Sequence, residues 1–477
     1  MAHWAWQGVA LASVLTLIGT ADAQTIRTKQ YDDGGVYEGA FLNGKQHGQG
    51  TYRLPNGYEY IGDWVNGEIR GLGIARFPNG SIYKGTFVAG KPSGTGEITF
   101  TDGGTFEGDW LDGNITGSGI ASYANGIIYE GEFRNAMHHG MGTMKSPNGY
   151  VYQGPWINGV KEGDGHTTYS DGAKYAGNLK AGEREGTGTL TMADGSIYAG
   201  TWVNGEIEGQ GRLEQPNGDI FDGDLVASRR QGNGTVVYVN GDSYVGSFLN
   251  DKRHGQGTFI GVDGYSYNGD WKEGQIEGVG KVMYPDGSTY TGMLSADLAE
   301  GTGKITYADG SSYDGTWNNG VISGTGVAIY SNDMIYKGEF QNAKNHGQGK
   351  ITSPDGYTYD GSWADGQRSG LGRAVYTDGT IYDGNFKNGQ RDGNGEITFS
   401  NGFVYQGEWT DGEISGQGKA TYANGDIYEG TFVRGRRQGT GTMRYYASGE
   451  KIMGDWTNGS PPVIKITPIV EDPPTEN

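Results

Sequence analysis

The chain has 477 residues, of which 92 are glycine and 34% are hydrophobic, and its formal net charge is −20. This composition leaves little side-chain volume for a thick core, so it predicts a thin architecture. The acidic balance excludes nucleic acid as the bulk partner, because polyanions bind clustered Lys and Arg. The chain has no cysteine, which excludes disulfides and thiolate metal sites.

Residues 1–23 differ in composition from everything that follows. An apolar run from Val9 to Ile18 precedes an Ala-Asp-Ala tripeptide at 21–23, which has the small-residue pattern of a cleavage site before Gln24. The run is too short for a stable membrane anchor. We therefore expect a secretory signal peptide at 1–23 and an exported protein, periplasmic or secreted, from a bacterium.

Beyond this segment one sequence pattern recurs with a fixed period of 23 residues. An aromatic residue opens each copy at positions 37, 60, 83 and onward to 428, and the period slips only in the last copy, where Gly454 lies 24 residues after Gly430. Such repeats stack as identical supersecondary units. We expect a half repeat at 24–36, an array of about 19 repeats at 37–459 and a Pro-rich tail at 460–477.

Each copy contains the pattern of two short strands. In the first, alternation places Tyr60, Gly62 and Trp64 on one face and the variable residues between them on the other, toward solvent. The second strand is expected after a Gly-x-Gly pair, as in the stretch from Gly96 to Phe100. Each repeat is therefore predicted to be a half-buried β-hairpin.

The two turns of each repeat have different sequences. Asn or Asp recurs at 33, 56, 79 and onward to 424 and is followed by Gly in every copy except one, where Asp333 takes its place. Such a pair is typical of a type I′ hairpin turn. The other turn, at Asn43 and Gly44, loses its Gly in some copies, so we expect it to be looser. The repeated pair at Gly48 and Gly50 is interpreted as structural, because a phosphate-binding loop occurs once and precedes a helix.

The sequence resembles the MORN repeat (membrane occupation and recognition nexus). The motif YEGAFLNGKQHGQG, which starts at Tyr37, returns as YEGEFRNAMHHGMG at Tyr129 and YKGEFQNAKNHGQG at Tyr336. The resemblance implies an all-β fold: an elongated single-layer antiparallel sheet of stacked 23-residue hairpins. It also implies a scaffold or protein-binding platform, with lipid binding proposed for some members. The residues expected to form this repeat structure are Tyr37, Gly39, Phe41, Gly48, Gly50, Tyr60, Gly62, Trp64, Tyr129, Gly131, Phe133, Tyr336, Gly338 and Phe340.

A second period of 46 residues overlies the first. The residue that closes the first strand alternates between Trp and Phe or Leu, except that Leu225 is followed by Phe248. We expect a bend near 225–248. Trp copies often carry Ile after the turn and the others carry polar or basic residues, so the two classes are expected to place this turn differently. These residues are Ile69, Ile207, Ile276 and Ile414 against Lys45, Arg184, Arg229, Lys252 and Arg391.

No catalytic or cofactor-binding pattern stands out. His47, His139, His254 and His346 share one repeat position but fall in repeats far apart, so we interpret them as turn residues. The carboxylates form no unique pair of the kind that acid–base catalysis needs. Neither a nucleophile elbow nor a phosphate-binding motif occurs. We therefore expect a protein that is not an enzyme and has no cofactor.

Two functions compete. The first is a non-enzymatic extracytoplasmic scaffold that binds proteins, with a homodimer left open and no residue singled out for partner binding. The alternative is a cell-envelope binder of glycan, through exposed aromatics, or of phospholipid head groups, through the basic turn at Arg434, Arg436 and Arg437. Exposed side chains at Trp64 and Trp110 would favour glycan, and buried ones the scaffold. The region from Pro461 is expected either to cover the last sheet edge or to serve as a docking segment.

Overall fold

The computed structural model describes residues 25–463, which form one antiparallel sheet of 39 strands and contain no helix. The all-β class and the antiparallel sheet of repeated hairpins are therefore confirmed. The predicted signal peptide and residues 464–477 of the tail lie outside the described residues.

Each repeat contributes a seven-residue strand followed by a nine-residue strand, as in β2 and β3. The first strands are β2 (Val36–Leu42), β4 (Glu59–Val65), β6 (Ile82–Val88), β8 (Thr105–Leu111), β10 (Ile128–Arg134), β12 (Val151–Ile157), β15 (Lys174–Lys180), β17 (Ile197–Val203), β19 (Ile220–Val226), β21 (Ser243–Leu249), β23 (Ser266–Lys272), β25 (Thr289–Ser295), β27 (Ser312–Asn318), β29 (Ile335–Gln341), β31 (Thr358–Ala364), β33 (Ile381–Lys387), β35 (Val404–Thr410), β37 (Ile427–Val433) and the shorter β39 (Lys451–Trp456).

The second strands follow in the same order, and a short β1 precedes them all. They are β1 (Arg27–Gln30), β3 (Lys45–Arg53), β5 (Glu68–Arg76), β7 (Lys91–Thr99), β9 (Asn114–Ser122), β11 (Met137–Lys145), the interrupted pair β13 (Val160–Lys161) and β14 (Gly163–Thr168), β16 (Glu183–Thr191), β18 (Glu206–Glu214), β20 (Arg229–Val237), β22 (Lys252–Ile260), β24 (Gln275–Met283), β26 (Leu298–Thr306), β28 (Val321–Ile329), β30 (Lys344–Thr352), β32 (Gln367–Val375), β34 (Gln390–Thr398), β36 (Glu413–Thr421) and β38 (Arg436–Arg444).

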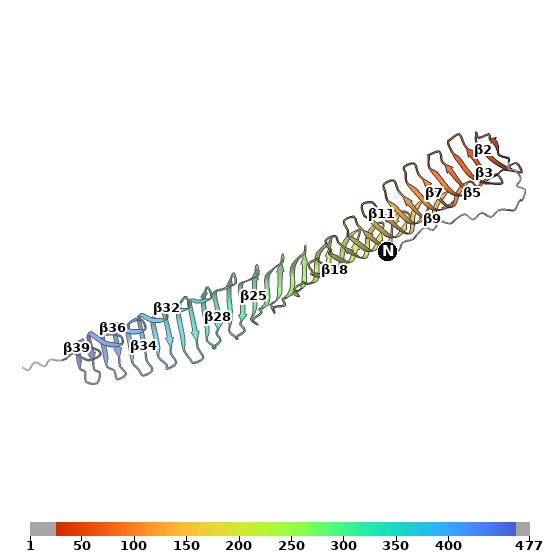
Figure 1. Cartoon of the computed structure of the whole chain (residues 1–477). Coiled ribbons are helices and arrows are strands. Elements are labelled where there is room, and N and C mark those ends of the chain that lie inside the picture. The colour runs from red at the N-terminus through yellow and green to blue at the C-terminus, as the bar shows by residue number, and fades with distance from the viewer. Residues whose placement is uncertain (1–24, 464–477) are drawn as a thin grey trace, which may run out of the picture. The chain divides into compact units, whose positions relative to one another are not determined.

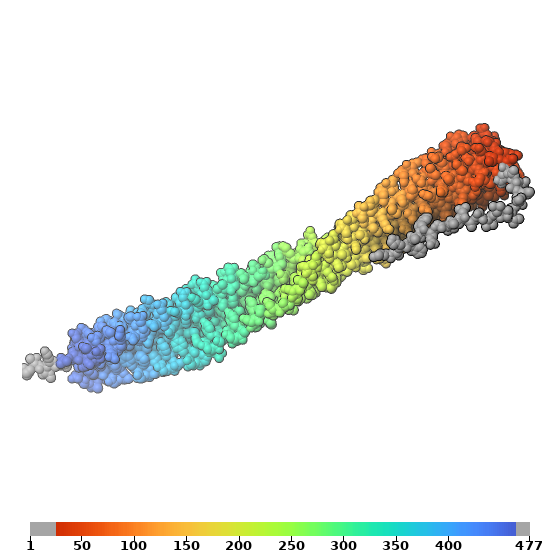
Figure 2. All heavy atoms as spheres, in the orientation of Figure 1, coloured from red at the N-terminus to blue at the C-terminus, as the bar shows by residue number. Residues whose placement is uncertain are grey.

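The strands group into two compact units. One extends to Asn217 and includes Leu225–Ser228, and the other comprises Gly218–Asp224 and the chain from Arg229 onward. Within each unit consecutive strands pair side by side, β2 with β3 and β3 with β4 in the first, β21 with β22 and β22 with β23 in the second (Figure 1). In the space-filling view, atoms of consecutive repeats touch throughout each unit (Figure 2). The boundary lies beside the stretch for which a bend is expected, and the bend itself stays a prediction.

The core is a row of tyrosine rings that lie over glycine pairs. Tyr37 is 0% exposed, and its ring covers Gly39 and Gly50, which are opposite each other on β2 and β3. A Cβ atom placed on Gly50 would lie 2.4 Å from the Cε2 atom of Tyr37, and the Tyr37 hydroxyl donates to the Ala40 carbonyl at 2.9 Å. The ring therefore belongs to the same repeat as the glycines that it covers.

Each ring also joins its repeat to the next one. The Tyr37 centroid lies 5.1 Å from that of Phe41 in its own strand and 5.0 Å from that of Trp64 in the following repeat, both in edge-to-face geometry. Tyr60 has the same relation to Trp64 and Phe87. Because each ring packs against a ring of the next repeat, the stability of each repeat depends on its neighbours.

The first glycine of the Gly-x-Gly pair forms a bulge. Gly39 is opposite Gly50 and Phe41 is opposite Gln46, so three residues centred on Gly48 face one residue of β2. Gly48 has φ +77°, a conformation that favours glycine. Gly48 thus lies in the bulge, and Gly50 lies under the tyrosine ring. The second strand, however, begins several residues earlier than expected, because the bulge absorbs the Gly-x-Gly pair into the ladder instead of preceding it.

The type I′ turn was predicted at the wrong one of the two turns. The type I′ turn is the short one, in which Asn43 and Gly44 both have positive φ, 48° and 77°, between the paired residues Leu42 and Lys45. This turn is not looser where glycine is missing. Copies with Ala136, Ser228 or Asp297 keep φ of 61°, 64° and 67°, so the strand ladder imposes the left-handed conformation on them.

The Asn-Gly or Asp-Gly turn is instead a longer loop. The Gly57 amide donates to the Leu54 carbonyl, the Leu54 amide donates to the Tyr58 carbonyl, and only Gly57 has positive φ. This is the geometry of a type I turn followed by a glycine bulge. Pro55 is the second residue of this turn, where a type I turn favours proline, so the sequence itself indicates this turn type.

The 46-residue period arises from contacts between successive repeats. Both classes of repeat have similar φ values in the short turn, so the conformation of this turn does not distinguish them. What differs is the residue opposite the closing aromatic. Ile69 is buried, whereas the Arg253 guanidinium lies 4.0 Å from the centre of the Trp271 ring of the next repeat and donates to the Gly274 carbonyl at 3.1 Å. Lys45, Arg229 and Lys252 come one residue before the position opposite the closing aromatic residue, and they are exposed.

The ends of the array keep the repeat geometry. β1 pairs with β2, as a half repeat requires. The extra residue of the last copy lies in the loop closed by Tyr445 and Glu450, so Gly454 is still opposite Gly441. Beyond β39, Pro462 packs against Gly454, where an added Cβ would lie 2.9 Å from the proline Cγ. This contact brings the start of the tail onto the last strand.

Alanine in place of a ring-covered glycine should destabilise the repeat that contains it. A Cβ on Gly96 would lie 2.2 Å from the Tyr83 hydroxyl, so we expect Gly96→Ala to lower the free energy of unfolding by about 2–3 kcal/mol. Gly104→Ala is the control, because the equivalent residue of another repeat is Ala173, and it should change stability by less than about 0.5 kcal/mol. Urea unfolding of both variants measures the difference, and equal stability would contradict the ring-on-glycine packing.

The buried phenols predict a loss of stability at alkaline pH. Burial raises the pKa of Tyr83 and Tyr152 to about 12, whereas phenols of the unfolded chain titrate near about 10. Since the folded pKa is the higher one, stability is unaffected below about pH 10 and falls as the pH rises toward about 12. Urea midpoints should show this decline, and Tyr83→Phe should reduce it while Tyr446→Phe, at an exposed site, should not. An equal decline in both variants would count against the explanation.

Candidate binding groove

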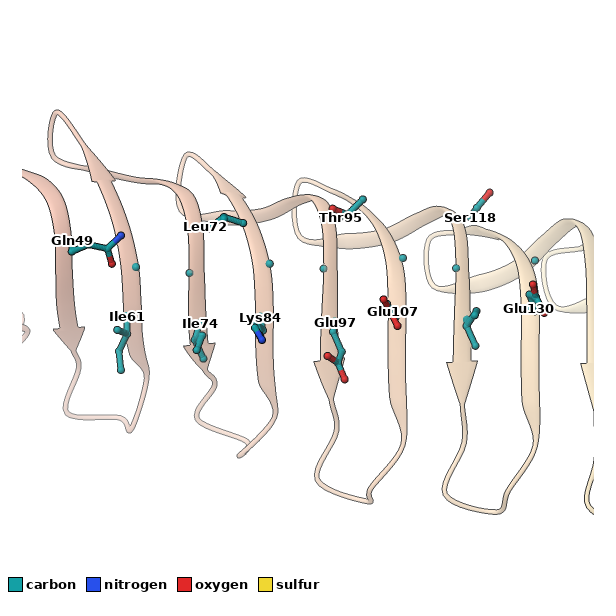
Figure 3. A pocket seen from close by; sticks show the side chains of 18 residues that line it. Gln49, Ile61, Leu72, Ile74, Lys84, Thr95, Glu97, Glu107, Ser118 and Glu130 are labelled. Atoms are coloured by element: carbon teal, nitrogen blue, oxygen red, sulfur yellow. The ribbon is translucent and has the colours of Figure 1, made fainter. Parts of the chain in front are cut away.

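The face opposite the tyrosine rings carries the variable side chains of each strand. Between β3 and β10, within the first unit, this face is hollowed into a groove of about 1050 Å³ (Figure 3). We call it the glycine groove, because the backbone of a row of glycines forms its floor. Its side chains are those of Gln49, Ile61, Leu72, Ile74, Lys84, Thr95, Glu97, Glu107, Ser118, Ile120 and Glu130.

The floor and the core are two sides of the same glycine row. Gly62 is opposite Gly73 within one hairpin, and Gly73 is opposite Gly85 of the next, so the row continues across hairpins. The Cβ positions of these glycines point toward the tyrosine rings. The groove side is therefore a strip of bare backbone between two rows of side chains, one with Leu72 and Thr95 and the other with Ile61 and Ile74 (Figure 3).

The start of the groove is apolar. Ile61 on β4 is directly opposite Ile74 on β5, and Leu72 projects from the other side of the floor. These side chains are 45%, 42% and 66% exposed. Three neighbouring aliphatic groups left in water indicate an interaction surface.

The groove becomes acidic further along. Glu97 on β7 is directly opposite Glu107 on β8, and Glu130 follows on β10 beside Ile120. On the other side of β7, Lys84 of β6 is directly opposite Glu97. Within the described residues, however, no ion pair joins Lys84 to any of these carboxylates. Like charges directly opposite each other in a sheet destabilise the pair, so this arrangement works against stability.

The second unit has the same face with a different chemistry. A hollow of about 730 Å³ there contains Lys337 directly opposite Lys350. Between neighbouring hairpins, at the register where Glu97 is opposite Glu107 in the first unit, opposite charges form ion pairs: Lys350 with Asp360 at 3.9 Å, Arg373 with Asp383 at 2.8 Å and Lys419 with Glu429 at 3.5 Å. The groove face is thus a repeated geometry whose charge changes along the chain.

The residues singled out from the sequence lie on the core side of this floor. Tyr37, Phe41, Tyr60 and Trp64 belong to the ring face, and Gly39 and Gly50 form the pair beneath a ring. Equivalent positions hold Gly62, Tyr129, Gly131, Phe133, Tyr336, Gly338 and Phe340, and Gly48 forms the bulge. The variable residues of the first strands, such as Glu38 and Lys84, are exposed. The groove that such residues line was not predicted from the sequence. The available signal was the aliphatic residues at 61, 72, 74 and 120 among variable positions that are mostly polar.

The four repeated histidines lie on second strands beside the bulge, so their expected place in a turn was wrong. Among them His47 makes a structural contact, as does the basic turn residue Arg437. The His47 Nδ1 atom accepts a hydrogen bond from the Asn66 amide of the next repeat at 3.4 Å. Arg437 lies 4.4 Å from the Trp456 ring centre and donates to the Gly459 carbonyl at 2.6 Å, so it is not a free partner for a phosphate, while Arg434 and Arg436 are exposed. In the part of the chain described, His, Asp and Glu side chains form no group of three that could hold a metal ion.

The tryptophans of the described array are buried, but other aromatics are half exposed. Trp64 and Trp110 are 5% and 8% exposed, so they offer no ladder to a glycan. A second aromatic row follows the long turns, in which Tyr307 and Tyr330 of successive repeats are 38% and 37% exposed. The buried tryptophans favour the scaffold over a glycan site on those rings.

The geometry defines an all-β repeat protein whose core and open face share one glycine row. The chain belongs to the MORN-repeat family, whose pattern matches nearly the whole described array: residues 37–57, 60–82, 83–105, 106–128, 129–149, 152–174, 175–197, 198–220, 221–243, 244–264, 267–289, 290–312, 313–334, 336–356, 359–381, 382–404, 405–427 and 428–449. It is a repeat-based scaffold of the protein-binding or membrane-associated kind. In the described range, no helix is long and apolar enough to cross a membrane.

Among solved structures, similarity is weak. The TCP domain of SAS-4 from Drosophila melanogaster, in a complex with a proline-rich motif of Ana2, is 12% identical, with 42% of this chain and 90% of that one covered and a TM-score of 0.20. The TCP10 domain of CPAP from Danio rerio is 14% identical, with 46% and 93% covered and a TM-score of 0.18. Virginiamycin B lyase from Staphylococcus aureus is 12% identical, with 68% and 98% covered and a TM-score of 0.11. No curated protein matches the chain.

The opposed carboxylates predict a stabilising substitution. Glu107→Gln removes the repulsion from Glu97, so the free energy of unfolding should rise by about 0.5 kcal/mol at low salt and less at high salt. Glu429→Gln is the matched control at the same register, where Lys419 lies 3.5 Å away, and it should lower stability slightly. Urea unfolding at two salt concentrations measures both. A loss of stability in Glu107→Gln would show that this carboxylate has a favourable partner instead.

Proposed function

We propose that the protein is a non-enzymatic scaffold that binds protein partners in the glycine groove and acts outside the cytoplasm. The observation that carries this proposal is a groove of about 1050 Å³ with exposed aliphatic side chains over a glycine floor. A floor of bare backbone lets another chain approach closely, and the aliphatic groups supply area to bury. The location outside the cytoplasm rests on the signal-peptide pattern at 1–23.

The repeat architecture supports a platform for several contacts. The same face recurs in both units with different charges, so separate segments of a partner, or separate partners, have different places to bind. Linked weak contacts raise the overall affinity without any single tight site. Self-association into a homodimer is compatible with this proposal and is one outcome of its test.

The second candidate is a binder of envelope glycan. The half-exposed Tyr307 and Tyr330 favour it, because sugar rings stack on aromatic faces and these rings stand one repeat apart. A phospholipid binder has less support, since Arg437 already caps a turn in its own sheet.

Crosslinking from the groove distinguishes these candidates. A photoreactive amino acid at Thr95, in the groove, should give protein adducts in intact cells, whereas the same group at Thr101, in the exposed long turn of that repeat, should give few. Fractionation of the cells before analysis reports whether the adducts lie outside the cytoplasm. Adducts with polysaccharide or lipid alone would overturn the protein-binding proposal. Adducts confined to the cytoplasmic fraction would overturn its location.

A further inference from the structure

The glycine groove has a direction, because its two ends differ in chemistry. Ile61, Leu72 and Ile74 make the apolar end on β4 and β5, and Glu97 and Glu107 make the acidic part on β7 and β8. The direct opposition of Glu97 and Glu107 works against stability, since within the described residues neither carboxylate forms an ion pair. The fold does not require it, because the same register elsewhere holds an ion pair, as in Arg373 with Asp383 and Lys419 with Glu429.

The groove dimensions limit its occupant. Six strand spacings separate β4 from β10, which is roughly 29 Å. An extended polypeptide covers that length with about nine residues. Three spacings, roughly 14 Å, separate the apolar end from the opposed carboxylates, and about four extended residues cover that distance.

We infer that the glycine groove binds an extended polypeptide segment with aliphatic side chains at one end and Lys or Arg about four residues away. The aliphatic side chains lie on Ile61, Leu72 and Ile74, and the cation lies between Glu97 and Glu107. Its charge neutralises the opposed pair, so the complex relieves the repulsion. This inference deepens the proposed function and rests on it, because it names the chemistry of the partner in the same groove.

Ile120 and Glu130 extend the same recognition. They are directly opposite each other on β9 and β10, and Ile120 is exposed. A longer segment therefore finds a further aliphatic contact and a further carboxylate beyond the first cation. The preferred occupant is thus amphipathic along its length, with its basic residues toward β10.

Synthetic peptides test the inference on the whole chain. The probes are fluorescein-labelled twelve-residue peptides with Ile and Val at one end and Lys at the other, made in both chain directions, and matched peptides with Glu in place of Lys. Fluorescence anisotropy should show that a Lys peptide binds and that its Glu counterpart does not. Added salt should weaken the complex, because part of the affinity is electrostatic.

Variants locate the site. The double variant Glu97→Gln, Glu107→Gln should weaken binding of the Lys peptide about tenfold, and Leu72→Ser should weaken it by about the same factor. The double variant Lys337→Gln, Lys350→Gln changes the same two repeat positions in the second unit and should leave binding unchanged. Unfolding curves of each variant confirm that the sheet is intact.

The outcomes separate the inference from the proposed function. Equal binding of Lys and Glu peptides, or an equal loss in the second-unit variant, would overturn the inference while leaving the groove a protein-binding surface. Absence of binding by every peptide would also overturn the inference, and crosslinking from Thr95 would then decide the proposed function independently.

Discussion

The packing of a tyrosine ring on a pair of glycines is the contact on which the rest of this structure depends. The ring of Tyr37 occupies the space that side chains at Gly39 and Gly50 would fill, so three positions of each repeat are determined together. The ring then contacts the closing aromatic of its own repeat and of the next. A sheet with no second layer over its described residues thereby buries its large rings almost completely, which a flat single sheet with ordinary side chains does not achieve.

Further contacts between repeats reinforce this packing at the short turns. The residue beside the bulge accepts an amide hydrogen bond from the next turn, as His47 and Glu300 do, and Arg253 covers the next tryptophan and caps a carbonyl. Such links join nearest neighbours only, so stability is expected to be nearly a sum over repeats and their interfaces. They also explain why Trp and basic residues alternate with a period of two repeats.

Periodicity made most of the fold predictable, and the candidate site far less so. Strict spacing assigned Tyr60, Gly62 and Trp64 to one face, because strand alternation follows from backbone geometry alone. The turn types were exchanged because both turns end in glycine, and which carbonyl accepts the turn hydrogen bond depends on the strand register. The groove was missed because the variable residues that line it come from eight strands, and a repeat pattern discards such variation as noise.

The loop with an extra residue, between Tyr445 and Glu450, shows how such a protein can change length during evolution. A residue added in a strand would send every following side chain to the opposite face, whereas a residue added in a long turn leaves the faces unchanged. Duplication of a whole 23-residue repeat adds two strands and likewise leaves every side chain on its original face. The core can therefore be copied without redesign, while each copied groove segment is free to acquire its own specificity.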